Sequence, residues 1–208
     1  MRGLPINTGE GEGMIYFTAD THFWHKHIID YCKRPWSTVE EMNAGMIHHW
    51  NSRVTQDDTV YFIGDFAFCG TTKAQEIFAR LKGRKHLVIG NHDYQSAKKL
   101  EWATQCEYAL IRPYIEYQDD EGELKKVPHP IVLCHYPILS WDGMAHGSWH
   151  LHGHCHGSLH DVGALRMDVG VDANNWFPVS LVEVQSRMAL RMVTPVDHHR
   201  PENKSKPA

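Results

Sequence analysis

Five short apolar runs of the chain each end in residues whose side chains can bind metal ions. The runs cover residues 14–17, 60–63, 87–89, 131–134 and 149–152. Short runs rich in β-branched and aromatic residues, bounded by glycine and polar residues, indicate buried strands. Because ligand sites in open sheets collect beyond the carboxyl ends of the strands, five such endings predict a metal-centred active site. The endings are, in order, Asp20-Thr21-His22, Gly64-Asp65, Gly90-Asn91-His92-Asp93, His135 and Gly153-His154-Cys155-His156.

The size and composition of the chain suit one soluble domain. Its 208 residues are 42% hydrophobic and 22% charged, which is ordinary for a globular protein. The net charge of -4 gives no electrostatic footprint for non-specific binding of nucleic acid. This argues only weakly against a nucleic-acid substrate, because bound divalent cations would reverse the field locally.

The cysteines and the apolar stretches indicate the cellular compartment. The 5 cysteines include no C-x-x-C pair, which indicates reduced thiols in a cytosolic protein. We expect Cys155 to point away from its flanking histidines, because neighbours along a strand alternate faces. No apolar stretch is long enough to span a bilayer, and the N-terminus has no signal-peptide pattern. The expected location is therefore the cytoplasm, with no membrane partner.

The chain is predicted to form a single domain over residues 14–194, between a loose leader over 1–13 and a disordered tail over 195–208. Residues 37–40 form a predicted capping box that begins an amphipathic helix, and Thr72 is the expected N-cap of a second helix that ends near Gly83. These strand–helix–strand units imply parallel neighbouring strands. Farther along, 114–117 and 125–127 predict a hairpin, and 169–172 and 180–184 predict the last strands. The expected fold class is α/β with a mixed sheet, or two packed sheets with helices outside.

Two of the motifs each place two metal-ligating residues close together in sequence. Asp20 and His22 are two residues apart, so on an extended segment their side chains would face the same side and could hold one ion. His154 and His156 repeat this spacing. A packed or solvated pair of side chains would show the same pattern.

The other three endings have ordinary structural alternatives as well. Asp65 follows a glycine, as the aspartates of Asx-turns and helix caps do. Gly90 and Asn91 suit a tight turn, although the amide oxygen of Asn91 can also ligate a metal. His135 could be a hydrogen-bonded histidine at the end of a strand.

Together the five endings resemble the signature of the calcineurin-like metallophosphoesterase superfamily, which reads D-x-H, G-D, G-N-H-[DE], a lone His and G-H-x-H. All five motifs occur in this order over residues 20–156, and the last predicted strands extend the resemblance to about residue 184. The segment around the first motif is similar to a compact bacterial and phage subgroup. The resemblance implies a four-layer αββα sandwich of two mixed β-sheets flanked by helices, with a dinuclear metal centre.

The resemblance also implies a role for each matching residue. A hydroxide between the two ions would be the nucleophile. His92 would protonate or stabilise the leaving-group oxygen, and Asp93 would hydrogen-bond an imidazole and set its tautomer. The mixture of carboxylate, amide and imidazole ligands favours Mn²⁺; Fe, Zn²⁺ or Ni²⁺ would also fit. One ion would be held by Asp20, His22 and His156 and the other by Asn91, His135 and His154, with Asp65 bridging both.

The implied activity is metal-dependent hydrolysis of phosphate esters. We favour a phosphodiesterase or nuclease that acts on nucleotides or single-stranded nucleic acid. The alternatives are a phosphomonoesterase and, in a different class, a non-catalytic scaffold of the same fold. Residues 64–70 lack the second Asp and the Arg of the G-D-x-x-D-R-G motif of protein Ser/Thr phosphatases, which argues against a phosphoprotein substrate.

Several aromatic residues near the motifs could stack on a nucleobase. Trp24, His25 and Tyr136 are the predicted substrate-binding residues, whereas we expect Trp149 to lie in the core. Arg34 could meet a phosphate, although surface arginines usually have no specific role.

Overall fold

Three parallel strands form the centre of a five-stranded sheet. The computed structural model of the chain describes residues 13–159 and 164–191. In it, β1 (Ile15–Thr18), β2 (Thr59–Ile63) and β3 (Arg84–Val88) pair in parallel, which confirms that prediction. The short strand β4 (Gln105–Cys106) pairs with β3, and β11 (Val179–Ser180) pairs antiparallel with β1. The predicted tail over 195–208 and nearly all of the predicted leader lie outside the described residues.

A second sheet of four strands has the order β10-β9-β8-β5. Strands β8 (Ile131–Cys134), β9 (Trp149–His152) and β10 (Arg166–Asp168) run parallel to one another, and β5 (Tyr108–Ile111) is antiparallel to β8. The bounds of β8 and β9 match the apolar runs in the sequence. The fold is therefore mixed α/β with two mixed sheets.

The main core lies between these two sheets. Phe17 and Ile63 of the first sheet belong to the same buried cluster as Leu133 and Leu151 of the second. Alternating side chains of a strand point to opposite faces, so each sheet contributes one apolar face to this layer. Trp149 belongs to the cluster too, as predicted, and a loop with the short helix η1 (Met144–His146) adds Trp141.

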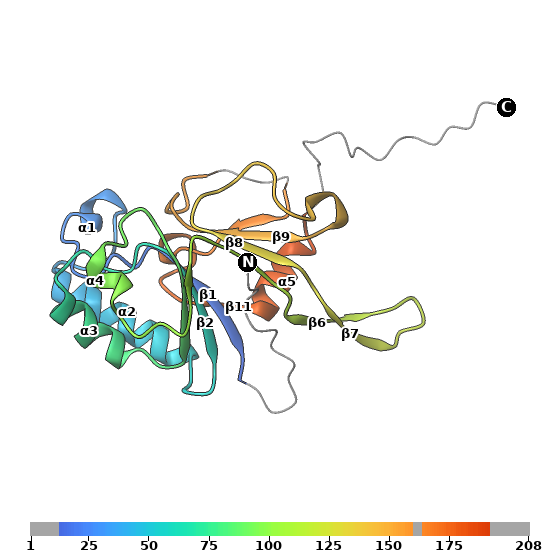
Figure 1. Cartoon of the computed structure of the whole chain (residues 1–208), viewed down its shortest axis with the longest axis horizontal. Coiled ribbons are helices and arrows are strands. Elements are labelled where there is room, and N and C mark those ends of the chain that lie inside the picture. Colours follow the sequence, from blue (N-terminus) through green and yellow to red (C-terminus); the bar gives the residue numbers. More distant parts are fainter. Residues whose placement is uncertain (1–12, 160–163, 192–208) are drawn as a thin grey trace.

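Helices α2 (Val39–Arg53) and α3 (Thr71–Arg80) cover the other face of the five-stranded sheet (Figure 1). Their inward residues include Trp50 and Ile77, which share a second buried cluster with Phe62 of β2. The single-turn helices α1 (Ile28–Tyr31) and α4 (Gln95–Lys98) lie in the loops on the same side. No described helix is both long and apolar enough to cross a membrane.

The helix starts differ slightly from their predicted positions. The capping box of α2 is formed by Thr38 and Glu41, one residue later than predicted, because the Thr38 hydroxyl accepts from the Glu41 amide. Helix α3 has Gly70 as its N-cap, so the prediction of Thr72 is wrong by two residues.

The C-terminal part of the chain corrects two predicted strands. Residues 169–172 follow β10 and run into the 3-10 helix η2 (Val171–Ala173). Most of residues 180–184 belong to helix α5 (Leu181–Met188), not to a strand. The physical reason is a capping box: Ser180 accepts from the Glu183 amide while the Glu183 carboxylate accepts from the Ser180 amide.

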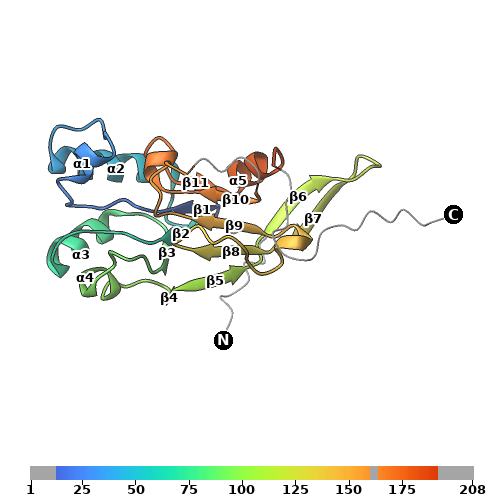
Figure 2. The same cartoon turned by 90° about the horizontal axis from the view of Figure 1, so that it is seen from above.

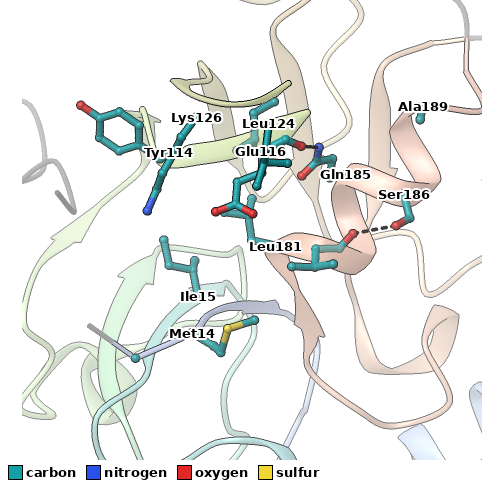
Figure 3. Close-up of a pocket in the computed structure, with 13 residues that line it drawn as sticks. Met14, Ile15, Tyr114, Glu116, Leu124, Lys126, Leu181, Gln185, Ser186 and Ala189 are labelled. Atoms are coloured by element: carbon teal, nitrogen blue, oxygen red, sulfur yellow. Dashed lines mark hydrogen bonds between the residues drawn. The ribbon is translucent and has the colours of Figure 1, made fainter. Parts of the chain in front are cut away.

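The predicted hairpin is confirmed as β6 (Tyr114–Gln118) and β7 (Leu124–Pro128), and it extends away from the two sheets (Figure 1, Figure 2). A cavity of about 740 Å³ lies between this hairpin, the start of β1 and α5 (Figure 3). Apolar side chains such as Ile15 and Leu181 line it. None of the predicted site residues does, so this cavity is separate from the predicted metal centre.

Candidate metal centre

The loops that follow β1, β2, β3, β8 and β9 meet at one edge of the two sheets. The Asp20 amide donates to the Gly64 carbonyl at 2.9 Å, and the His22 amide donates to the Asp65 carbonyl at 3.0 Å. Within the second sheet, the Gly153 amide donates to the His135 carbonyl at 3.1 Å. Between the sheets, the His154 amide donates to Oδ2 of Asp20 at 2.9 Å, and Nδ1 of His135 lies 2.8 Å from the Ile63 carbonyl, so residues from both sheets share one site.

Asp65 lies at the centre of this site and is 2% exposed. Its Oδ2 atom is 3.4 Å from Nε2 of His22 and 3.5 Å from Nε2 of His135. Its Oδ1 atom accepts from the His92 amide at 2.8 Å. One carboxylate oxygen thus lies between imidazoles of the two predicted ligand sets, as a bridging ligand requires.

On one side of Asp65, three atoms with lone pairs converge. The Nδ1 atom of His135 lies 2.8 Å from the Ile63 carbonyl, which only accepts, so Nδ1 carries a proton. The Nε2 atom then faces Oδ1 of Asn91 at 3.0 Å, which in turn lies 3.1 Å from Nδ1 of His154. A second proton on Nε2, an Asn91 amide turned to donate its N–H, or a shared cation would each satisfy these atoms.

On the other side of Asp65, buried polar atoms have no hydrogen-bond partner. Oδ1 of Asp20 and Nε2 of His22 make no hydrogen bond among the described residues, although both side chains are buried. The ligand atoms of Asp20, His22 and His156 all lie within 4.8 Å of one another. Because unpaired buried polar atoms are costly, this arrangement fits a divalent cation bound among them.

The pKa shifts of the same three side chains also fit a bound divalent cation. Burial raises the pKa of Asp20 to about 8 and lowers the pKa of His22 to about 3. Burial would also lower the pKa of His156, but hydrogen bonds to Asp172 and Cys32 and the charge of Asp20 raise it to about 10. The buried acid and the imidazolium hold protons where a bound cation would supply the positive charge.

The backbone at the centre is unusual. Nine described non-glycine residues have positive φ, and five of them are predicted metal ligands. The prediction that each ligand pair lies on an extended segment is therefore wrong, because these residues are in the left-handed region after their strands end. Such conformations are uncommon and cluster at functional sites. The five ligands are Asp20, His22, Asp65, His154 and His156.

The predicted role of Asp93 is also wrong. Its carboxylate accepts from the backbone amides of Gly90, Asp65 and Phe66 at 2.8–3.0 Å, and no imidazole is among its hydrogen-bond partners in the described part of the chain. Asp93 therefore fixes the loops after β2 and β3 to each other. The ring of His92 lies 5.6 Å from that of His22, and its Nδ1 atom has no partner among the described residues.

Two of the three predicted substrate contacts lie beside the centre. The ring of His25 is 5.5 Å from that of His22, and the ring of Tyr136 is 4.8 Å from that of His154. Trp24 instead packs against the core behind α2, with the ammonium of Lys73 4.1 Å above its ring.

The supporting ion pair behind the centre is not apparent from the sequence. Arg34 is 4% exposed, not a surface arginine, and it donates to both carboxylate oxygens of Asp172 and to the carbonyls of Asp20 and Thr21. Asp172 in turn lies 2.7 Å from Nδ1 of His156. Because this carboxylate occupies Nδ1, Nε2 is the nitrogen of His156 that remains available to a metal ion. No motif could reveal the pair, because Arg34 and Asp172 are 138 positions apart.

One of the five cysteines, Cys32, lies close to potential metal ligands of the centre. All five are free thiols, as predicted. Cys155 belongs to none of the groups of potential metal ligands among the described residues. Cys32, which the sequence did not single out, forms such a group with His156 and Asp172.

Comparisons with known proteins give relatives of similar size. No family model matches the chain. The chain is similar to the gene 66 protein of Mycobacterium phage L5, with 29% identity over 186 residues that cover 76% of this chain and 86% of the phage protein. The crystal structure of AQ665 from Aquifex aeolicus, a protein of unknown function, matches with a TM-score of 0.58 and 23% identity. That match covers 84% of this chain and 99% of AQ665, and it supports the fold alone.

A relative from Methanocaldococcus jannaschii is more similar in sequence. The uncharacterized protein MJ1445 is 35% identical over 179 residues, which cover 80% of this chain and 86% of MJ1445. The chain therefore belongs to the same family as MJ1445.

Proposed function

We propose that this protein is a dinuclear-metal-dependent phosphoesterase of the calcineurin-like superfamily, with the αββα sandwich of that superfamily. The observation that supports the proposal is the convergence of the seven predicted ligands around Oδ2 of Asp65. Five separate strand endings supply them, and two of their buried atoms, Oδ1 of Asp20 and Nε2 of His22, make no hydrogen bond among the described residues. A histidine-rich storage site would not need Asp65 and Asn91 at separate strand ends.

The donor set fits two divalent ions. Asp20, His22 and His156 would hold one, Asn91, His135 and His154 the other, and Asp65 both. Mn²⁺ is the favoured metal, with Fe, Zn²⁺ and Ni²⁺ as the other candidates. Bound ions would lower the pKa of a water and neutralise charge on the phosphoryl oxygens.

The side chains around the ligands would position the substrate and move a proton. Hydrolysis forms a P–O bond from water and breaks the P–O bond to the leaving group, whose oxygen takes up a proton. His92 would supply that proton. Two observations support this role: its ring lies 5.6 Å from that of His22, and its Nδ1 atom makes no hydrogen bond among the described residues. Asp93 would keep the His92 loop rigid through the backbone amides it accepts from.

The hydrogen bonds of Arg34 favour a phosphodiester substrate over a phosphomonoester. A monoester dianion needs extra cationic groups, but the guanidinium of Arg34 is occupied by Asp172 and two backbone carbonyls. A diester carries a single negative charge and needs fewer partners. We therefore favour a nucleotide or nucleic-acid diester, with a phosphomonoesterase as the second candidate.

Hydrolysis assays with Mn²⁺ test the proposal. We expect turnover of bis-p-nitrophenyl phosphate to exceed that of p-nitrophenyl phosphate, and EDTA to abolish both. His92→Ala should lower kcat by about 10²–10⁴-fold while the protein retains its metal. The control is His48→Ala, at an exposed position of α2, which should match the wild type. Absence of turnover with every divalent metal would contradict the proposal and favour a non-catalytic scaffold.

A further inference from the structure

Exposed aromatic side chains gather around the metal centre. Among the described residues, six aromatic side chains are exposed, and four of them contact rings of the centre or of His25. Large apolar rings in water are unfavourable, so such a group around one site indicates a ligand with matching apolar faces. The four residues, with their exposed fractions, are Tyr31 (73%), Phe68 (44%), Tyr94 (56%) and Tyr136 (45%).

Two of these residues lie next to His92, on the side where the leaving group would depart. The ring of Phe68 is 5.8 Å from that of His92, and the ring of Tyr94 is 6.3 Å from it. Phe68 and Tyr94 contact each other at 6.1 Å, and His25 stacks on Phe68 at 4.6 Å. Together they form an aromatic wall on this side, which we call the Phe68 wall.

The fold holds this wall in a fixed position relative to the ligands. The Phe68 amide donates to the Phe23 carbonyl at 2.8 Å, beside a parallel bridge between Phe23 and Ala67. Tyr94 is the N-cap of α4, and its amide donates to the His92 carbonyl at 3.0 Å. Both aromatic residues are therefore attached to the loops that carry the metal ligands.

The opposite side of the centre carries Tyr136. Its ring contacts those of His154 at 4.8 Å and His135 at 5.3 Å, both predicted ligands of the second ion. The site thus has an aromatic surface on either side of the position that the phosphate would occupy.

A cavity of about 590 Å³ adjoins the centre and has room for the nucleotides next to the scissile phosphate. It is lined by His154 and His156 of the centre together with Tyr31 and Lys33. The ammonium of Lys33 is a partner for a further phosphate, and Tyr31 offers another ring. These are the contacts expected for single-stranded nucleic acid, which is bound by stacked bases and cationic groups along the backbone.

We propose that the substrate is single-stranded nucleic acid, with the base of the leaving nucleoside on the Phe68 wall and the base across the scissile phosphate on Tyr136. This inference rests on the proposed phosphoesterase function. In this proposal, Phe68, Tyr94 and Tyr136 determine which substrate is bound. The metal ligands contact only the phosphate, so they do not distinguish between the groups that it joins.

The test compares a fluorescein-labelled thymidine oligonucleotide with an abasic tetrahydrofuran oligomer of equal length. Wild-type protein with Mn²⁺ should hydrolyse the thymidine substrate with the higher kcat/KM. Phe68→Ala and Tyr94→Ala should each reduce the kcat/KM ratio between the two substrates by about 10-fold or more, since each base stack is typically worth that much. Phe68→Trp keeps a stacking ring and should retain the ratio. Tyr117→Ala is the control, because Tyr117 lies on the hairpin and is similarly exposed (45%).

A second readout does not depend on turnover. In EDTA, fluorescence anisotropy should show that Phe68→Ala weakens binding of the thymidine oligonucleotide, while Tyr117→Ala does not. Hydrolysis of both oligomers at equal rates, or an unchanged ratio in Phe68→Ala, would overturn the inference and leave the phosphoesterase intact. If the protein bound the thymidine oligonucleotide through its bases but hydrolysed no substrate with any metal, the proposed phosphoesterase activity would be refuted. The proposed base contacts would then still be supported.

Discussion

At the residue scale, the position of His156 depends on a buried network rather than on its own loop. Its Nδ1 atom lies 2.7 Å from Asp172, and Asp172 is held by the guanidinium of Arg34 at 2.8–2.9 Å. A carboxylate behind a ligating imidazole fixes its orientation and increases its basicity. In the proposed centre, Asp172 would therefore act on a bound metal through His156.

We predict that Asp172→Asn weakens metal binding by about 10–100-fold, because the amide holds the His156 ring less strongly. Isothermal titration of the metal-free protein with Mn²⁺ measures the change. Asp119→Asn, at the hairpin salt bridge with Lys125, is the control and should bind as the wild type does. Unchanged affinity in a folded Asp172→Asn protein would show that Asp172 does not position the ligand.

The residue scale also shows what a sequence can and cannot reveal about such a site. The sequence could predict seven residues that the structure brings to one site, because each follows an apolar run in a short motif. Their left-handed backbone could not, since it depends on contacts between loops from different strands. The role of Asp93 could not be inferred either, because its partners include the amides of Asp65 and Phe66, 28 and 27 positions away.

At the element scale, the centre depends on how closely the ends of β2 and β3 approach each other. Gly64 has φ +85°, and a Cβ atom there would lie 2.4 Å from Nδ1 of His135 and 2.7 Å from the Cα atom of Gly90. Two strand ends can meet beside a buried ligand only if this position has no side chain.

We expect Gly64→Ala to lower the free energy of unfolding by about 2–4 kcal/mol, from the positive φ and from overpacking together. It should also reduce the bound metal, because His135 has to move. Gly122→Ala is a matched control: it has φ +84° and nothing within 4 Å, so it should cost only about 1 kcal/mol. Urea denaturation and metal analysis of both variants make the comparison, and equal losses would contradict the close approach.

Most elements could be predicted from local patterns, and the exceptions have local causes. The apolar runs predict β8 and β9 with correct bounds because each run is short and bounded by polar residues. Residues 180–184 look like a strand because of their apolar composition. The capping box of Ser180 and Glu183 outweighs that composition and begins helix α5 instead.

At the scale of the whole molecule, buried histidines make the fold sensitive to acid. Burial lowers the pKa values of His86, His129 and His150 to about 4. Above the ordinary value of 6.5, these side chains are neutral in both the folded and the unfolded protein. As the pH falls from 6.5 towards 4, the unfolded chain takes up protons that the folded protein does not, so stability decreases over this range.

We therefore predict that the free energy of unfolding falls between these pH values, with His86 alone contributing up to about 3 kcal/mol. His86 is 3% exposed and stacks on Tyr61, so it cannot be hydrated in the folded state. His86→Gln should flatten the pH dependence, whereas His48→Gln, at an exposed position, should not. Urea denaturation across the pH range measures both, and an unchanged slope in His86→Gln would contradict this assignment.

The central claim is that two sheets bring seven residues together around two metal ions. Anomalous diffraction from crystals soaked in Mn²⁺ tests this claim most directly. We predict two anomalous peaks on either side of the Asp65 carboxylate, one beside Asp20, His22 and His156 and one beside Asn91, His135 and His154. A single peak, or peaks only elsewhere on the molecule, would contradict it.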